Sequence, residues 1–564
     1  MLNNKNVLFG LFLNRYTLVS ALVLQGAMAH AQVVVPDSGS ILRDIQSTPA
    51  FEAGAENQSE VTLPADKAPA VNADDGGLAI LVERFAVTGN SAFSSDVLVG
   101  LVADLQGKTL TLAQLEEAAS RITLHYREQG YFLSRAYLPQ QDVSGGVITI
   151  AVLEGRLGEV RLENTSRVKD SVIQRPFKKV EAGQLVTAEP LETPLLHLSD
   201  ITGARSSTTL APGSQAGTTD LIIKSEPAPL VSGTVELDNF GNRYTGEYRL
   251  GASVRVNNPT GYGDRLDLRA LASDEEQIFF RAQYAIPVGP WATEIGGAWS
   301  DMDYELGDQF ADIGATGNAQ IATAFVRQNF VRTRAFNLEA QLQYDRKDLE
   351  DKIKTFGSLS DKDSELYTLT VSGDLRDNLW GGGITRASLA YTHGELQINS
   401  FLDKVIDSIT ARTDGSFYRW TPSIMRLQNL GGKWSLHAQV HGQFASKNLD
   451  SSEKLSLGGA YAVRGFPQGE ASGDQGWIAN LELRYDINRA WQVFGLLDHG
   501  DLKRNKNRWS NAENTIDLSA AGLGARWRHD SFYVSGTIAT PVDSRDSAID
   551  NRDPRAWVQA IWQF

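Results

Sequence analysis

The feature that most constrains how this chain can fold is strict two-residue alternation of apolar and polar side chains over long segments. Residues 336–344 alternate over nine positions, residues 434–444 over eleven, and residues 265–270 form a third example. A period of two gives a β-strand one apolar and one polar face. Segments of about ten residues also match the length of a tilted membrane strand. A soluble β-sandwich can alternate as well, but its strands usually have about five or six residues.

The character of the chain changes near residue 229. All 11 tryptophans lie between Trp291 and Trp562, and none lies in the first 228 residues. Tryptophan is enriched where a membrane meets water, because its ring is apolar and its N–H needs a polar partner. The polar faces of the alternating segments carry charges and amides, which a water-filled lumen tolerates. These features together predict a transmembrane β-barrel over residues 229–564.

The length of this region indicates how many strands it holds. Residues 229–564 number 336, so sixteen strands would have 21 residues each, connection included, whereas twelve would need 28. We expect about sixteen antiparallel strands, because 21 residues fit the usual strand with its turn or loop, and the family resemblance described below favours the same number. The last strand must close the barrel and end at a membrane interface. Trp562 and Phe564 lie on one face of it and are interpreted as the terminal signal of the barrel.

The first 31 residues are interpreted as a signal peptide. Two basic side chains precede a mostly apolar stretch, and Ala29 and Ala31 supply the small-x-small pattern that predicts cleavage after residue 31. The alternative is an N-terminal membrane anchor, but the apolar run 18–24 is too short to span a bilayer. No later segment offers about 18 consecutive apolar residues. The mature chain is therefore expected to be exported, and either to be soluble or to cross a membrane as a barrel.

Residues 78–154 are predicted to form a compact α/β unit. Thr111 and Gln114 make a capping box, apolar side chains follow at helical spacing as far as Tyr126, and Gly130 ends the helix. Strands are expected at residues 82–87, 133–138 and 147–153. Residues 155–228 repeat this plan more weakly, with strands expected at 159–163 and 220–224. Two similar small domains are therefore predicted before the barrel.

The segment between the signal peptide and the first small domain divides into two parts. Residues 51–77 are rich in Ala, Asp, Glu and Gly and cannot bury a core, so they read as a linker. Within residues 32–50, Ile41, Leu42 and Ile45 form the apolar face of a short amphipathic helix. Such a short helix is not stable alone and must dock elsewhere if it is ordered.

The sequence offers no catalytic or metal site. The chain has no cysteine, which excludes disulfides and thiolate sites, and its formal net charge of -15 argues against a nucleic-acid partner. His437 and His441 have metal-like spacing, but on an alternating strand they would lie roughly 13 Å apart. Residues 107–109 (Gly-Lys-Thr) lack a correctly spaced upstream glycine for a phosphate loop. No enzyme, cofactor or metal is therefore expected.

Several motifs resemble one known family. Residues 126–131 (YREQGY) and 151–155 (AVLEG) look like parts of a POTRA domain, and residues 237–241 (LDNFG) look like the start of the associated barrel. The order of the predicted parts also resembles a known layout, in which a helix and a linker are followed by two small domains and a barrel. This is the layout of two-partner secretion (TpsB) outer-membrane transporters of the haemolysin and filamentous-haemagglutinin exporter type. The superfamily also includes outer-membrane assembly factors. This resemblance covers nearly the whole mature chain.

The sharpest match is Val463-Arg464-Gly465-Phe466, about 100 residues before the end of the chain. In the superfamily this motif is the tip of a long loop that folds back into the barrel, and its arginine pairs with an aspartate on the inner wall. The resemblance therefore implies a loop lock between Arg464 and Asp498. A guanidinium and a carboxylate in a partly wet lumen can form a bidentate pair. Gly465 would let the tip turn without a Cβ clash.

The resemblance implies a type V, two-partner secretion transporter in the outer membrane of a Gram-negative bacterium. POTRA-like domains in the periplasm would bind an unfolded TpsA-type exoprotein by strand addition, and the helix at residues 41–45 would plug the resting lumen while loosely held. Lipid and, during biogenesis, the barrel assembly machinery would be its other partners. The cargo could be a haemolysin, an adhesin or a contact-dependent toxin.

Two other functions compete with secretion as interpretations of this sequence. An assembly factor that inserts other barrels usually carries more POTRA domains and no plug helix. A passive porin or a barrel enzyme has no need of the two small domains predicted in residues 78–227.

Overall fold

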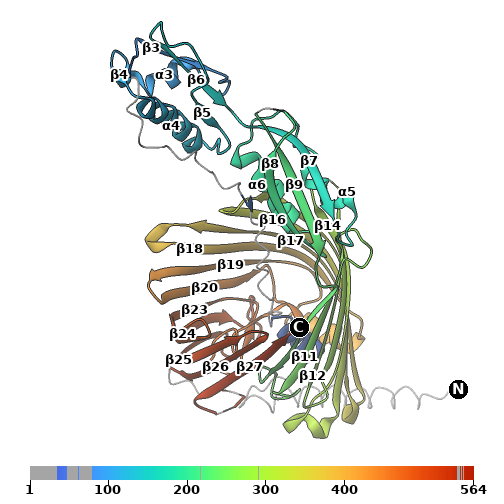
Figure 1. The fold of residues 1–564 in the computed structure, drawn as a ribbon. Coiled ribbons are helices and arrows are strands. Elements are labelled where there is room, and N and C mark those ends of the chain that lie inside the picture. The colour runs from blue at the N-terminus through green and yellow to red at the C-terminus, as the bar shows by residue number, and fades with distance from the viewer. Residues whose placement is uncertain are drawn as a thin grey trace, which may run out of the picture.

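The computed structural model describes residues 35–47, 61–62, 79–215, 217–289, 291–542, 547, 549–550 and 552–564. Two small α/β domains stand at one rim of a large β-barrel, and the first of them is the more distant from it (Figure 1). The interpreted signal peptide, with Ala29 and Ala31, and most of the interpreted linker lie outside the described residues. No helix in the described ranges is both long and apolar enough to cross a membrane.

Within the described residues, a closed barrel of sixteen antiparallel strands occupies the second half of the chain, as the alternation predicted. In order around the barrel they are β10 (Val231–Asp238), β11 (Arg249–Asn257), β12 (Arg265–Ser273), β13 (Ile278–Val288), β14 (Thr293–Glu305), β15 (Ala315–Arg332), β16 (Phe336–Ile353), β17 (Ser358–Asp377), β18 (Gly383–Ile398), β19 (Gly415–Gly431), β20 (Trp434–Ala445), β23 (Gln475–Asp486), β24 (Trp491–Lys503), β25 (Thr515–His529), β26 (Phe532–Pro541) and β27 (Arg555–Gln563).

The barrel closes by pairing its first and last strands. β10 and β27 are antiparallel, with Thr234 opposite Gln563, and Gly233 and Phe564 exchange two backbone hydrogen bonds of 3.0 Å. A Cβ atom on Gly233 would lie 2.5 Å from the Phe564 ring, so only glycine leaves room for this aromatic side chain. Trp562 and Phe564 are both exposed on the outer surface. This position is where a terminal aromatic meets the membrane interface.

The strands differ more in length than the sequence suggested. β10 has 8 residues and β17 has 20, so ten residues per strand is too short for the middle of the barrel. On the outer faces of β16 and β17, the rings of Tyr344 and Tyr367 contact each other in a tilted arrangement with centroids 5.0 Å apart. Beyond them the outer face of β16 carries Arg346 and Asp348, both about half exposed. The long strands therefore continue past the apolar belt into water.

The connections carry short elements of their own. At the rim far from the small domains lie η3 (Asp308–Ile313), η4 (Lys354–Phe356) and α7 (Phe401–Ile409), while η5 (Leu379–Gly381) lies in a turn at the near rim. The connection between β20 and β23 holds η6 (Ser451–Glu453), β21 (Leu455–Ser456) and β22 (Ser472–Gly473). It is the longest connection within the described part of the barrel.

Domain 1 is a three-stranded sheet covered by helices. Its elements are β2 (Ile80–Leu81), β3 (Arg84–Thr88), α3 (Ser95–Gly100), η1 (Ala103–Leu105), β4 (Thr109–Leu110), α4 (Leu112–Glu128), β5 (Arg135–Tyr137) and β6 (Val147–Leu153), with sheet order β3-β6-β5. The capping box of Thr111 and Gln114 is present, and Gly130 follows α4 with φ +88°. The predicted apolar face is buried except for Leu112, which is exposed at the first turn.

Glu154 connects the two segments of domain 1 that carry the family resemblance. Its buried carboxylate accepts hydrogen bonds from Ser91 N at 2.5 Å, from Ala92 N at 2.7 Å and from the Tyr126 hydroxyl at 2.9 Å. Burial by itself raises the pKa of Glu154, but the bonds from Ala92 and Ser91 outweigh it and hold this pKa below its ordinary value. One buried anion therefore links Tyr126 in the first of these segments to Glu154 in the second.

Domain 2 has the same element order and shares its sheet with a piece of the linker. Its elements are β7 (Arg156–Asn164), α5 (Asp170–Ile173), η2 (Arg175–Phe177), α6 (Ala188–Ser199), β8 (Ala204–Pro212) and β9 (Thr218–Pro227), in the order β1-β8-β9-β7. The two-residue strand β1 (Val61–Thr62) pairs in parallel with Thr208 and Thr209 of β8. Hydrogen bonds from α6, from η2 and from Lys169 just before α5 to the near ends of barrel strands and to one turn position this domain on the near rim.

Candidate functional site

The helix α2 (Ser38–Ser47) lies against the inner wall of the barrel. Ile41, Leu42 and Ile45 are almost fully buried, so all three side chains chosen from the sequence face the wall. Their apolar surroundings come from strands β12 to β16 and from the nearby loops, and include Tyr244, Leu271, Phe279, Met302, Tyr304, Phe310, Ile321 and Leu349. A helix too short to be stable alone is therefore held by burial of its apolar face.

Polar contacts fix the start of α2 on two sides. Ser38 donates from its backbone N at 2.7 Å and from its hydroxyl at 3.0 Å to the Asp351 carboxylate on β16. On the other side, Arg43 donates to the Ser451 carbonyl at 3.0 Å, and the Ser451 hydroxyl donates to Asp37 at 2.6 Å. In this conformation these hydrogen bonds add to the apolar burial of the helix, and its loose attachment stays a prediction.

The connection 446–474 folds inward as a hairpin, with β21 antiparallel to β22. Its first part is bound to the wall that also holds α2. Asp450 accepts a hydrogen bond from Lys362 of β17 at 2.8 Å, and Glu453 lies 2.5 Å from Lys347 of β16. The base of this loop thus has two buried ion pairs, and it contacts α2 through Ser451.

The tip of the loop reaches the opposite wall. Val463 and Phe466 are fully buried against apolar wall residues of β23, β24 and β25. At Gly465 a Cβ atom would lie 2.8 Å from the Ala520 side chain and 2.9 Å from the backbone N of Pro541. The close approach of the tip to this wall therefore requires glycine at position 465.

Arg464 and Asp498 form a bidentate pair between the loop tip and β24. The guanidinium donates from Nε and from Nη2 to the two carboxylate oxygens, each at 2.7 Å, and the backbone N of Arg464 donates to the same carboxylate at 3.1 Å. Asn480 of β23 bridges the contact, because its amide donates at 2.8 Å both to Asp498 and to the Ala462 carbonyl. Trp557 of β27 donates to the Arg464 carbonyl at 2.7 Å.

Glu482 is a second anionic partner that the sequence analysis missed. It accepts from Arg464 Nη1 at 2.6 Å, and Arg484 and Arg526 lie within 2.6 and 2.9 Å of its other oxygen. The signal was present in the sequence, since Asn480, Glu482 and Arg484 alternate with leucines along β23 and so share the lumen face. The lock is therefore a network of three arginines and two carboxylates.

The lock is drier than the sequence analysis expected. Arg464 is 7% exposed and Asp498 is 3% exposed, because the hairpin covers them. A partly wet lumen is the wrong description of this site in the closed conformation. A charge pair with little water around it is costly to break, because the remaining partner stays buried without a counter-charge.

His437 and His441 both lie on β20, which alternates as predicted. The described residues contain no group of three or more His, Cys, Asp or Glu side chains that could hold a metal ion. The site therefore consists of a helix and a loop that lie inside the barrel and are held against its walls by ion pairs, hydrogen bonds and apolar contacts.

The chain matches two family models. The model of the haemolysin secretion/activation proteins ShlB, FhaC and HecB matches residues 217–527, and the ShlB-type POTRA model matches residues 80–155. The first of these matches spans more than half of the chain, begins at the last strand of domain 2 and covers most of the barrel.

Individual proteins show the same likeness. The heme/hemopexin transporter protein HuxB of Haemophilus influenzae is 28% identical, over 98% of this chain and 99% of that protein. The outer membrane transporter CdiB of Dickeya dadantii is 24% identical, over 78% of this chain and 80% of that protein. The solved structure of CdiB from Escherichia coli has a TM-score of 0.63 at 21% identity, and covers 89% of this chain and 94% of that one. This last likeness shows the fold.

Proposed function

The chain belongs to the haemolysin secretion/activation family of ShlB, FhaC and HecB, and on this premise we propose how it captures and exports its partner. It is an outer-membrane transporter of two-partner secretion that recognises an unfolded exoprotein and passes it through its barrel. Its POTRA-type domains are periplasmic, so the rim beside them is the periplasmic rim. The proposal concerns the capture surface, the plug and the loop lock.

Capture begins at the sheet edge of domain 2. The observation that carries this step is the pairing of β1 with β8, because an extended segment adds there to an existing sheet. β1 covers two of the nine residues of β8. Strand addition uses backbone hydrogen bonds and so accepts many sequences, as an unfolded partner requires. The partner would extend along β8 in the place of the linker segment.

A cysteine at the proposed edge tests this step directly, because the chain has no cysteine of its own. We expect Thr209→Cys to form a disulfide with a single-cysteine partner that is stalled during export. The matched control is Glu117→Cys on the helix α4, whose parent side chain is 64% exposed and belongs to no sheet. Equal cross-linking at both positions would contradict capture at β8.

The helix α2 is proposed to close the resting lumen and to leave during export. We expect deletion of residues 36–50 to enlarge ion conductance in planar bilayers while secretion largely survives. Gly39→Leu should do the same, since even a Cβ there would lie 2.6 Å from the Ser451 hydroxyl and 2.9 Å from the Ser452 backbone. Gln46→Ala, at an exposed position of the same helix, is the control and should conduct as the parent does. Unchanged conductance in the deletion would contradict the plug.

The partner itself is proposed to be a large exoprotein of the haemolysin, adhesin or contact-dependent toxin type. The relative named as a heme/hemopexin transporter matches over nearly the whole chain, which adds a haem-related partner to these classes. The family is one of transporters with no catalytic activity indicated, and we propose that export proceeds without catalysis. Insertion by the barrel assembly machinery completes the proposed set of partners. Identification of a secreted protein that disappears when this chain is deleted would test the cargo class.

A further inference from the structure

Domain 2 rests on two periplasmic turns of the barrel through one short segment, residues 165–179. The backbone N of Lys169 donates to the Gly261 carbonyl at 2.9 Å, in the turn between β11 and β12. Arg175 donates to the Pro287 carbonyl at 3.0 Å, near the turn between β13 and β14. The side chains of this segment therefore lie at the rim where the barrel meets the inner leaflet.

This segment is strongly basic although the chain as a whole has a net charge of -15. We call its cations the basic ridge, which consists of Arg167, Lys169, Arg175, Lys178 and Lys179. Asp170 is the only acidic residue of the segment, and its carboxylate accepts a hydrogen bond from Asn164 at 2.7 Å. The ridge thus presents a positive surface on an acidic protein, where it attracts anions.

Two lysines of the ridge lie over aromatic side chains of the rim. The Lys169 ammonium is 3.5 Å from the centre of the Tyr262 ring, and the Lys179 ammonium is 3.7 Å from that of Trp291. Both rings are exposed, and they continue a row of exposed aromatic side chains at the periplasmic ends of other strands: Phe330, Phe336, Trp434, Trp491, Phe532 and Phe564. Such a row marks the level of lipid headgroups. The ridge is therefore at headgroup height.

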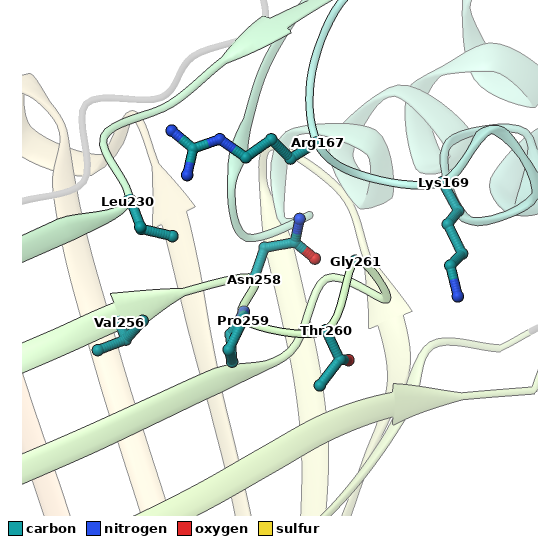
Figure 2. Close-up of a pocket in the computed structure, with 8 residues that line it drawn as sticks. All are labelled: Arg167, Lys169, Leu230, Val256, Asn258, Pro259, Thr260 and Gly261. Carbon is teal, nitrogen blue, oxygen red and sulfur yellow. The ribbon is translucent and has the colours of Figure 1, made fainter.

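A pocket of about 510 Å³ opens at the same junction (Figure 2). Its lining includes Arg167, Leu230, Val256 and Asn258 beside the turn 259–261. The Arg167 guanidinium has no hydrogen bond, ion pair or ring contact with any residue the structure describes. In Figure 2 the amide nitrogen of Asn258 lies on the side of Arg167.

Asn258 supplies an independent sign of a missing ligand. It is 4% exposed, and its amide oxygen accepts a hydrogen bond from the Gly263 backbone N at 2.7 Å. Its amide nitrogen is buried and has no hydrogen-bond partner within the described part of the chain. A buried donor without a partner costs free energy unless a ligand atom satisfies it.

We propose that this pocket binds the phosphodiester of a phospholipid from the inner leaflet of the outer membrane. Arg167 and the Asn258 amide would donate to the phosphate oxygens, as guanidinium and amide groups do in phosphate sites. Leu230, which is 39% exposed, and Val256 would contact the glycerol and the first acyl carbons. These apolar side chains favour a lipid over a free phosphate ion. The bound lipid fixes domain 2 at the membrane surface.

The test uses the full-length protein in detergent and native mass spectrometry with added dioleoylphosphatidylglycerol. We expect one tightly retained lipid in the parent protein, and affinity about tenfold or more lower in the Arg167→Gln, Lys169→Gln double variant. Dioleoylglycerol, which lacks the phosphodiester, should not be retained. Lys433→Gln is the matched control, because it removes a rim cation that lies 6.0 Å from the centre of the Tyr485 ring, outside the pocket. Altered mobility on heating shows that each barrel is folded.

Three results would overturn the proposal. Equal lipid retention by the double variant and the parent would exclude the ridge as the site. Displacement of the lipid by inorganic phosphate at equal concentration would show an anion site that does not select lipid. Unchanged lipid retention together with weaker binding of a partner fragment would show that the ridge is a cargo surface. Secretion is not the readout, so the proposed capture mechanism can fail without affecting this result.

Discussion

Deletion of residues 78–227 is expected to abolish secretion while a folded barrel stays in the outer membrane. Capture by the small domains holds an unfolded partner beside the pore, and tethering of this kind commonly raises the effective affinity by about 10² to 10⁴. Without it, the partner must find the lumen by diffusion from the periplasm. We therefore expect secretion to fall by about a hundredfold or more.

The barrel does not depend on these domains for its own closure. The ladder between β10 and β27 begins at Thr234, which lies beyond the deletion. The contacts that are lost are hydrogen bonds with turns at the rim, such as Thr193 to the Arg332 carbonyl at 3.0 Å and Asp200 with Arg332 at 2.7 Å. A closed barrel satisfies its backbone hydrogen bonds internally, so these losses leave the fold intact.

The measurement is the amount of partner in the medium, normalised to the amount of barrel in outer-membrane fractions. Heat-dependent migration on gels shows whether the deleted form is folded. A second variant that lacks only residues 79–154 retains β8, and it separates the role of domain 1 from that of the proposed capture edge. Export at the parent level by the larger deletion would show that the receptor lies elsewhere.

Periodicity predicted the barrel well because a lumen and a membrane impose opposite polarity on alternate residues. Segment 434–444 shows this, since it forms β20 with the predicted alternation. Strand length was predicted less well, because β16 and β17 continue in water beyond Tyr344 and Tyr367. There the outer face becomes charged, and nothing in a two-residue period marks where the membrane ends.

Contacts between residues that lie far apart in the sequence could be predicted only in part. The pairing of Arg464 with Asp498 came from a family resemblance, whereas Glu482 lay in an alternating strand that contains many polar residues. The ion pairs of Asp450 and Glu453 with β17 and β16 were not predicted, since a loop sequence does not show which wall it crosses. The same limit applies to β1, a two-residue strand inside a segment with the composition of a linker.

Replacement of Arg464 by Ala is expected to block secretion as well, for a different reason. The change leaves Asp498 buried beside Asn480 without its cation, and breaking a buried pair costs about 3–5 kcal/mol. The low exposure of both partners places the cost within that range. The barrel should still assemble on its own ladder, while the loop tip should lose its fixed position. Asp498→Ala should have the same effect.

Two substitutions separate geometry from charge. Arg464→Lys keeps the positive charge, but a single ammonium group cannot contact both oxygens of Asp498 and also Glu482. Secretion by this variant should therefore lie between that of Arg464→Ala and that of the parent. Arg426→Ala is the matched control, because Arg426 forms a bidentate pair with Asp377, at 2.8 and 2.9 Å, that does not touch the loop. Secretion by this control should remain close to that of the parent.

The double variant Arg464→Ala, Asp498→Ala tests whether the two residues act as one lock. Residues that serve a single contact are non-additive, so the double variant should be little worse than either single variant. In the two single variants and the double variant, the Glu482 carboxylate should keep its ion pairs with Arg484 and Arg526. The readout is secretion at equal barrel levels, with thermal unfolding as a check on the fold. Normal secretion by both single variants would show that the contact between the loop tip and β24 is dispensable, and that the loop is positioned for export by its base at Asp450 and Glu453.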